Sequence, residues 1–232
     1  MGSTTRPLKS VHVSPRRAGD PTPDLTGIRL GHRAMVTDSR RIAEVVTAIG
    51  EGRLRCTATR ARAICRYVDL LCESIHHHHT TEDEVLWPLI QASAGEHVDL
   101  SELTADHAAL EPRLEHVRAR AAELRRSGGD AITAASLGAA LTDLHTMLAE
   151  HIVEEEREVF PVITAHVSVG DWQAVEKAAQ KGGRMSFDGP RAMAVMTDDE
   201  RAQLAHSIGP VLRIVIGALS VRHRRLERTV FG

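Results

Sequence analysis

Two stretches of the chain decide the fold: residues 78–90, HHTTEDEVLWPLI, and residues 151–163, HIVEEEREVFPVI. Aligned on their first histidine, both have a glutamate four residues later and then an apolar residue, an aromatic residue and a proline. Side chains four residues apart lie on the same face of an α-helix. The chain therefore contains an internal repeat, and each copy places a histidine and a glutamate together on a helix.

The repeat lies within a longer helical pattern. Apolar residues recur at helical spacing in four successive segments, separated by Gly-, Ser- or Asp-rich breaks near Gly50, at 93–99 and at 127–130. The first segment carries His32 on its apolar stripe and the third carries His107. The stripes of the second and fourth segments are Ile64, Tyr67, Leu71, Ile75, His78, Glu82, Leu86, Leu89 and Leu137, Leu141, Leu144, Leu148, His151, Glu155, Val159, Val162. We predict an all-α fold, an up-and-down four-helix bundle.

The chain divides into three parts by composition. Residues 1–24 are rich in Pro, Ser and Arg and are expected to be a disordered arm, and residues 25–168 hold the bundle. Residues 169–232 are expected to form a C-terminal helical extension that closes one end of the bundle. Its apolar section, 208–221, would also suit a membrane surface or a partner protein.

Charge and cysteine content narrow the class of protein. The formal net charge is −2, and only residues 213–228 form a basic cluster, so we expect no nucleic-acid partner. The three cysteines have no CxxC spacing, which is typical of reduced intracellular thiols. The N-terminal residues do not resemble a signal peptide, and the longest apolar stretch is shorter than the ~20 residues of a membrane span. We expect a cytoplasmic protein.

The run of histidines at 76–79 offers two candidate pairs for the site, because His78/Glu82 and His79/Asp83 both have a spacing of four residues. An affinity tag is excluded by the position of the run between two helical segments. His78 continues the apolar stripe and lies as far before Pro88 as His151 lies before Pro161. We therefore expect His78 in the core and His79 beside the site.

Four histidines and two glutamates then occupy core positions. An ionised carboxylate in a core is costly unless cations or a metal compensate it. A buried His/Glu network without an ion is one interpretation; a charge-balanced cage for two divalent ions, built from facing helices, is the one we favour. Imidazole and carboxylate ligands suit iron, and manganese and zinc remain open. The predicted metal ligands are His32, His78, Glu82, His107, His151 and Glu155.

On these residues the chain resembles the bacterial hemerythrin-like (HHE cation-binding) family, whose helices carry the pattern H…HxxxE…H…HxxxE. The resemblance covers about residues 27–166. It implies an oxo- or hydroxo-bridged di-iron centre, with the four histidines as terminal ligands and Glu82 and Glu155 as bridging carboxylates. It also implies reactions with small molecules, namely O₂, hydrogen peroxide or nitric oxide.

The sequence departs from the oxygen carriers of that family, which use a fifth histidine one turn after the third-helix histidine. Here Glu111 stands at that place, and Val36 stands at the equivalent place in the first helix. Glu111 is a candidate catalytic acid or base, or an additional ligand. A solvated surface glutamate is the alternative interpretation.

With two histidines on each metal, both metals would keep a vacancy, which favours turnover over oxygen carriage. The sequence therefore predicts a di-iron oxidoreductase, peroxidase- or catalase-like, that consumes hydrogen peroxide, with nitric oxide as a candidate co-substrate. The alternative is a module that reversibly binds O₂ or NO, or senses iron or redox state. The sequence does not indicate an electron donor.

Overall fold

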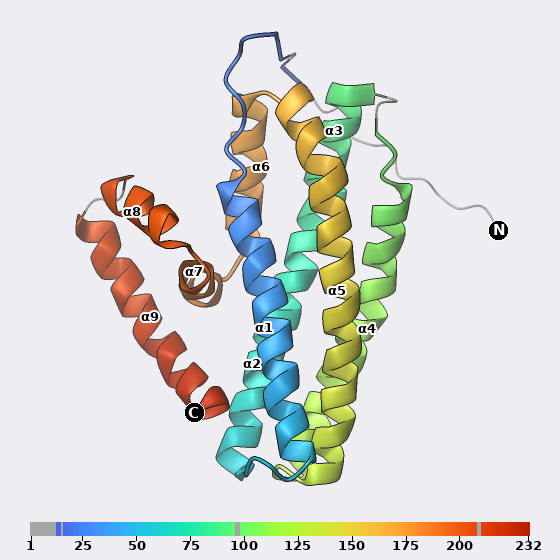
Figure 1. Cartoon of the computed structure of the whole chain (residues 1–232), viewed down its shortest axis with the longest axis vertical. Coiled ribbons are helices and arrows are strands. Elements are labelled where there is room, and N and C mark those ends of the chain that lie inside the picture. The colour runs from blue at the N-terminus through green and yellow to red at the C-terminus, as the bar shows by residue number, and fades with distance from the viewer. Residues whose placement is uncertain (1–12, 15, 96–97, 208–209) are drawn as a thin grey trace, which may run out of the picture.

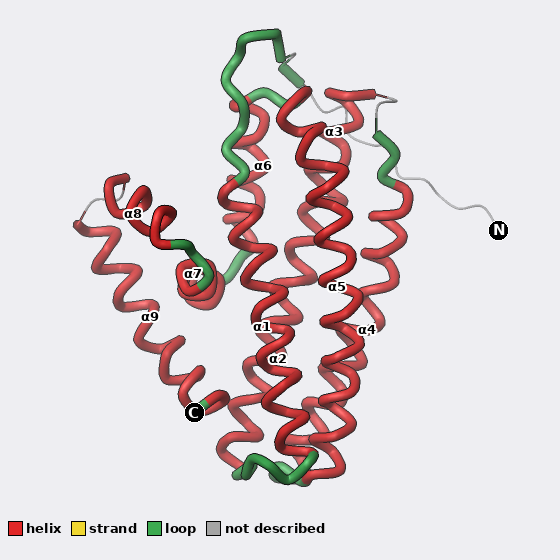
Figure 2. Tube along the Cα trace, in the orientation of Figure 1, coloured by secondary structure: helices red, strands yellow, loops and turns green. Residues whose placement is uncertain are grey.

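The computed structural model describes residues 13–14, 16–95, 98–207 and 210–232, with side chains outside 204–220. This described part is almost entirely helical and contains no strand (Figure 2). The helices are α1 Thr26–Gly50, α2 Ala58–Thr81, α3 Trp87–Ala94, α4 Ser101–Arg126, α5 Ala131–His166, α6 Val169–Gly182, α7 Met185–Ala194, α8 Asp198–Ser207 and α9 Pro210–Phe231, with a π-helical turn, η1 Glu82–Leu86, between α2 and α3. The predicted all-α fold is confirmed.

Four long helices, α1, α2, α4 and α5, form an up-and-down bundle (Figure 1). α1 packs mainly on α5, α5 on α4, and α4 on α2. The helix ends follow local sequence signals: Thr57 accepts a hydrogen bond from the backbone N–H of Arg60, and Asp130 accepts one from that of Thr133. These side chains satisfy backbone donors that have no partner within their own helices.

The interior of the bundle has three layers along its axis. One apolar cluster includes Ile42, Ile64 and Leu141, and a second includes Leu103 and Ile163 near the other end. Between them lies a layer of buried histidines and glutamates: His32, His79, Glu82, His107, His151 and Glu155. Apolar packing closes this layer at its two ends along the bundle axis.

The described parts of the C-terminal extension, which we expected over one end, lie along the α1–α2 side of the bundle (Figure 1). The buried Arg191 of α7 forms an ion pair with the buried Asp38 of α1. At the end of α9, the carbonyl of Val230 accepts two hydrogen bonds from Arg60. The apolar section at 208–221 falls almost entirely on residues whose side chains lie outside the described part.

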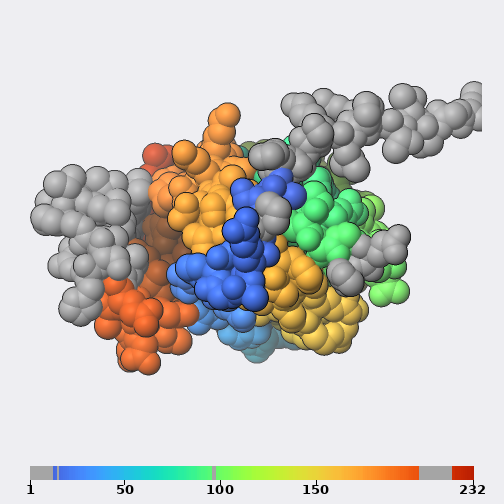
Figure 3. Space-filling view, turned by 90° about the horizontal axis from the view of Figure 1, so that it is seen from above, coloured from blue at the N-terminus to red at the C-terminus, as the bar shows by residue number. Residues whose placement is uncertain are grey.

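The segment before α1 contains no helix in its described residues and lies beside α6 (Figure 3). Arg16 donates to the carbonyl of Ala165 at 3.1 Å, and the indole Nε1 of Trp172 donates to the carbonyl of Asp24 at 2.9 Å. Residues 1–12 of the expected disordered arm lie outside the described residues. Among the described helices, none is long and apolar enough to cross a membrane.

Candidate metal centre

The buried polar layer contains two adjacent groups of metal-ligating side chains. His32, His78, Glu82 and Glu155 form one group, and His79, His107 and His151 form the other. Within each group, one potential ligand atom per residue lies within 4.8 Å of all the others. The six residues predicted as ligands are thus brought together, and His79 joins them.

The two glutamates lie between the two groups. Glu82 Oε1 is 3.0 Å from His78 Nε2, and Glu82 Oε2 is 3.5 Å from His107 Nε2. Glu155 Oε2 is 3.5 Å from His32 Nε2 and 3.9 Å from His151 Nε2. Each carboxylate therefore reaches histidines of both groups, as a carboxylate that bridges two ions must.

The neighbours of the two carboxylates are each other and the cluster histidines, with no Lys or Arg paired to them among the described residues. All four side-chain oxygens of Glu82 and Glu155 are buried without a hydrogen-bond donor among the described residues. Burial raises the pKa of Glu82 to about 8, and burial followed by repulsion from Glu82 raises the pKa of Glu155. Because an unpartnered buried carboxylate is costly, the missing partner is best supplied by cations.

Three of the histidines are held by carboxylates outside the cluster. Nδ1 of His32 donates to Glu156 and Nδ1 of His107 donates to Asp83, both at 2.9 Å, while Nδ1 of His151 donates to Asp106 at 3.2 Å. A proton fixed on Nδ1 leaves the lone pair of Nε2 pointing inward. Carboxylate–histidine pairs of this kind orient metal ligands and raise their basicity.

The internal repeat extends to these outer contacts. The acid that follows each cluster glutamate, Asp83 or Glu156, accepts a hydrogen bond from a histidine of the other copy of the repeat, His107 or His32. The aromatic residues of the repeat behave alike: Trp87 stacks on His107 with ring centroids 5.8 Å apart, and Phe160 stacks on His32 at 5.9 Å. The "LWP" and "VFP" endings thus provide a flat apolar wall for one histidine in each half.

Three of the cluster histidines, His78, His79 and His151, have a lowered pKa. Burial, and then the proximity of His107, lowers the pKa of His78 to about 3 and that of His151 to about 4. Burial and neighbouring histidines also lower the pKa of His79. Neutral imidazole is the form that binds a metal ion.

His79 is the residue that the sequence interpretation placed beside the site instead of in it. Its Nε2 is buried without a hydrogen-bond partner, and its ring stacks on that of His107 with centroids 4.3 Å apart. The π-helical turn begins three residues later, where the N–H of Trp87 bonds to the carbonyl of Glu82. The sequence signal that could have indicated His79 was the run of adjacent histidines. The π-helical turn could not have been predicted from apolar spacing, although such turns often occur at functional sites.

Glu111 is not brought into the cluster. Its carboxylate lies on the surface, where Oε2 accepts a hydrogen bond from Nδ1 of His76 at 2.8 Å, and 42% of its side chain is exposed. The structure therefore gives no contact between Glu111 and the ligand set. The fifth imidazole that the structure brings into the cluster is that of His79 on α2.

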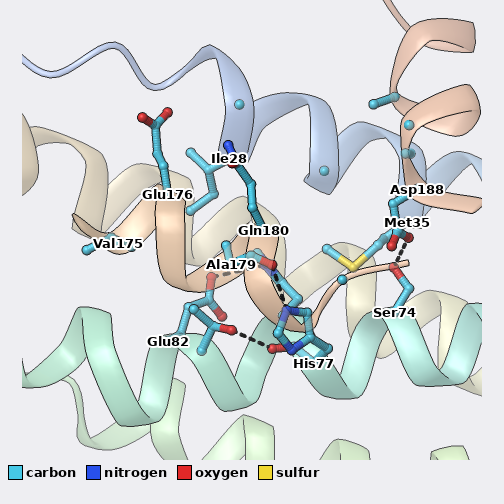
Figure 4. Close-up of a pocket in the computed structure, with 18 of the residues that line it drawn as sticks. Ile28, Met35, Ser74, His77, Glu82, Val175, Glu176, Ala179, Gln180 and Asp188 are labelled. Atoms are coloured by element: carbon cyan, nitrogen blue, oxygen red, sulfur yellow. Dashed lines mark hydrogen bonds and ion pairs between the residues drawn. The ribbon is translucent and has the colours of Figure 1, made fainter. Parts of the chain in front are cut away.

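One side of the cluster faces a pocket of about 340 Å³ between α1, α2, α6 and α7. His78 and Glu82 line its inner end, and Ile28, Glu82 and Ala179 bring three separate segments to the same space (Figure 4). The side chain of His78 is 19% exposed, whereas those of His32, His107 and His151 are at most 3% exposed. Access to the cluster is therefore greatest on the His78 side.

The donor set fits a pair of divalent ions. Five imidazoles and two carboxylates offer nitrogen and oxygen ligands of intermediate softness, which suit iron and also manganese or zinc. Facing helices of four-helix bundles hold such dinuclear sites in the same way. The four unpartnered carboxylate oxygens are the structural feature that a metal would complete.

Comparison with known proteins agrees with this geometry. The family described as "Hemerythrin HHE cation binding domain" matches residues 25–163, which is more than half of the chain and includes the whole cluster. No curated protein and no solved structure gave a significant match. The matched residues, the helical bundle and the His/Glu cluster together show that the chain belongs to the hemerythrin HHE cation-binding family.

Proposed function

We propose that the cluster holds two iron ions bridged by Glu82 and Glu155. His32 and His78 would complete the ligand set of one ion, and His79, His107 and His151 that of the other. The first ion then has fewer protein ligands, and it is also the one next to the pocket. The sequence suggested two histidines and one vacancy on each metal. With three histidines on one ion and two on the other, the two ions would not be equivalent.

We further propose that the centre consumes hydrogen peroxide. The observation that carries this proposal is the open His78 side of an otherwise sealed cluster. Reversible O₂ carriage requires a closed apolar site, because water and protons convert a bound oxygen species into side products. A site open to water allows peroxide to enter, protons to be exchanged and products to leave.

The chain's own residues would act chiefly by position. The iron pair supplies two-electron redox chemistry when bound. Asp83, Asp106 and Glu156 keep a proton on Nδ1 of their histidines, so that the Nε2 atoms stay available as ligands. Trp87 and Phe160 would keep water from the ring faces of His107 and His32 on which they stack.

Disproportionation of hydrogen peroxide needs no external electron donor. One peroxide is reduced to two waters by taking two electrons and two protons, and a second is oxidised to O₂ by releasing the same number. This balance suits a chain whose electron donor the sequence does not indicate. Nitric oxide, a small neutral molecule that fits the same opening, is the proposed co-substrate, and the cytoplasm is the proposed location.

Stopped-flow absorbance of iron-loaded protein mixed with excess peroxide, with and without nitric oxide, tests the proposal. We expect many peroxides to be consumed per centre, release of one O₂ for every two of them, and faster loss when nitric oxide is present. The His78→Ala/His151→Ala double variant should be inert. A single oxidation without turnover would contradict the proposed activity.

A sensing role is the second candidate, and one contact favours it. His77, the neighbour of His78, donates from Nε2 to the carbonyl of Ala179 on α6 at 2.8 Å. A change at the metal could thus reach the C-terminal extension. Limited proteolysis of the oxidised and reduced protein would support sensing if cleavage of α6 to α9 changed with redox state while peroxide turnover was absent.

A further inference from the structure

The pocket beside the cluster is larger than hydrogen peroxide requires. Its volume of about 340 Å³ compares with roughly 30 Å³ for one water molecule in the liquid. Pockets for organic ligands begin at about 300 Å³ and are mostly apolar, with a few placed polar groups. The lining has this character, with Ile28, Met35, Leu86, Trp172 and Val175 as its main apolar side chains.

The C-terminal extension builds much of this pocket. α6 contributes Trp172, Val175 and Ala179, and α7 contributes Met185 and Ala192. α6 is held to α2 by the His77–Ala179 hydrogen bond, and α7 by the bond that Ser74 donates to Asp188 at 2.7 Å (Figure 4). The extension thus forms a fixed wall that faces the accessible side of the metal cluster.

Two glycines of α1 keep the pocket open. Gly27 and Gly31 lie one turn apart on α1, Gly27 as the second residue of the helix and Gly31 further inside it, where glycine is less favourable than alanine. Neither has a positive φ. A Cβ at Gly31 would meet no atom within 4 Å, and one at Gly27 would meet only Glu176 Oε1, at an ordinary 3.5 Å. Neither packing nor backbone conformation therefore requires glycine at these two positions. A molecule bound in the pocket would require it, because a side chain there would take up part of the space.

The charges of the lining select a neutral ligand. Glu82, Glu176 and Asp188 contribute carboxyl groups, which disfavour an anion. The guanidinium of Arg191 is paired with two carboxylates, because Nε donates to Asp38 and Nη1 to Ser74 and Asp188, while Nη2 is buried without a hydrogen-bond partner among the described residues. The polar end of a neutral ligand would meet His78 and Glu82 at the inner end, while its apolar body packs against α1 and α6.

We propose that this pocket binds an organic hydroperoxide with a neutral, apolar body and presents its O–OH end to the His32/His78 side of the cluster. The inference rests on the proposed peroxide chemistry and extends it to a larger substrate. Reduction breaks the O–O bond and yields an alcohol and water. It consumes two protons and two electrons, and two ferrous ions held by the cluster residues would supply the electrons.

Binding is tested with 2-phenyl-2-propanol, the alcohol that corresponds to cumene hydroperoxide and cannot be reduced at an O–O bond. Zinc-loaded protein is titrated with it while tryptophan fluorescence is recorded, because Trp172 lines the pocket and Trp87 does not. We expect saturable quenching that weakens by about tenfold or more in Gly31→Leu, in which a bulky side chain fills the pocket. Gly31→Ala should weaken it less, and Gly170→Leu, on the exposed surface of α6, should match the parent.

Turnover then separates this inference from the proposed function. Ferrous protein is mixed with cumene hydroperoxide or hydrogen peroxide, and the ratio of the two oxidation rates is compared among the same variants. We expect this ratio to fall about tenfold in Gly31→Leu and to stay constant in Gly170→Leu. Reaction with hydrogen peroxide alone, or equal ratios in all variants with no saturable quenching, would overturn the organic-substrate pocket. Lack of reaction with both peroxides would instead overturn the proposed function.

Discussion

His78 and His79 are neighbours in the chain, and yet their imidazoles belong to different halves of the cluster. Nε2 of His78 lies 3.0 Å from Nε2 of His32, whereas the ring of His79 stacks 4.3 Å from that of His107. Both side chains leave α2 immediately before its π-helical turn. One short segment therefore supplies ligands to both halves, and this makes the halves unequal.

Removal of the His79 imidazole should affect one metal more than the other. In His79→Ala we expect about one ion per chain to remain tightly held, because the His32/His78 group keeps all of its donors. Metal analysis after dialysis measures this. His76→Ala is the matched control, since His76 lies on the surface beside Glu111 and should leave the metal content unchanged. Equal loss in both variants, or full retention in His79→Ala, would exclude His79 as a ligand.

Glu82→Gln should weaken metal binding but spare the metal-free fold. The amide cannot bridge two cations as a carboxylate does. It also cannot ionise, whereas burial raises the pKa of Glu82 to about 8 and makes its ionised form costly. The thermal midpoint of metal-free Glu82→Gln should therefore equal or exceed that of the parent at pH 9. Glu84 lies two residues away and is exposed, so Glu84→Gln should have the metal affinity and the thermal midpoint of the parent. A less stable metal-free Glu82→Gln protein would show that Glu82 has a structural partner.

The carboxylates behind the histidines should tune affinity. Asp83→Asn replaces a charged acceptor of the His107 Nδ1 proton with a neutral one, and such changes typically weaken metal affinity by about 10–100-fold. Competition with a chelator measures the change. Glu84→Gln serves again as the control, because Glu84 is adjacent and exposed. Unchanged affinity in Asp83→Asn would mean that the contact does not orient His107 in the loaded protein.

Metal-induced stabilisation should increase with pH. In the metal-free protein Glu82 has a pKa of about 8, so it keeps its proton when folded and loses it near its ordinary value when unfolded. The stability that the protonated Glu82 carboxyl gives the metal-free fold is present at low pH and is lost as pH rises through about 8. A metal ion must displace that proton at pH 6.5 but not at pH 9.

Thermal unfolding with and without Mn²⁺, a redox-stable probe, measures the effect. The rise in melting temperature on adding metal should grow between pH 6.5 and 8.5 and then level off. His78 and His151, whose pKa values are lowered, destabilise the metal-free fold only as pH falls below the ordinary pKa of histidine, so they do not reverse this trend. A constant rise across this range would contradict a protonated carboxyl in the metal-free cluster.

Docking of α7 should depend on the pair formed by Asp38 and Arg191. Both side chains are buried, and removing one partner of a buried pair leaves an uncompensated charge that costs about 3–5 kcal/mol. Arg191→Met should therefore destabilise the protein and expose the extension to protease. Asp38→Asn/Arg191→Met should recover much of the loss, as chemical denaturation can show. No recovery in the double variant would mean that Arg191 acts mainly through other contacts, such as Phe187, Ser74 and Asp188.

The sequence predicted the bundle and six cluster residues because both depend on local spacing. A residue four positions from another lies on the same helical face, and the repeat fixed which histidine pairs with Glu82. His79 escaped this reasoning, because a regular helix turns adjacent side chains about 100° apart. Only the ring contacts of His79 with His107 on α4 and His151 on α5 show that both histidines reach the interior.

The position of Glu111 and the path of the extension could not be predicted in the same way. Glu111 stands where the oxygen carriers have their fifth histidine, one turn after His107. Whether its carboxylate reaches the cluster or pairs with His76 depends on contacts between α2 and α4. The extension binds through Arg191, which the sequence does not distinguish from other arginines. Contacts between residues far apart in the chain decide both, and apolar periodicity carries no information about them.

The number of iron ions per chain tests the dinuclear centre most directly. Protein loaded with ferrous iron without oxygen, desalted and assayed for iron and protein should contain about two ions per chain, as the two groups of ligands predict. The His78→Ala/His151→Ala double variant should contain far less. One ion per chain in the parent, or the same iron content in parent and variant, would contradict a bridged pair held by Glu82 and Glu155.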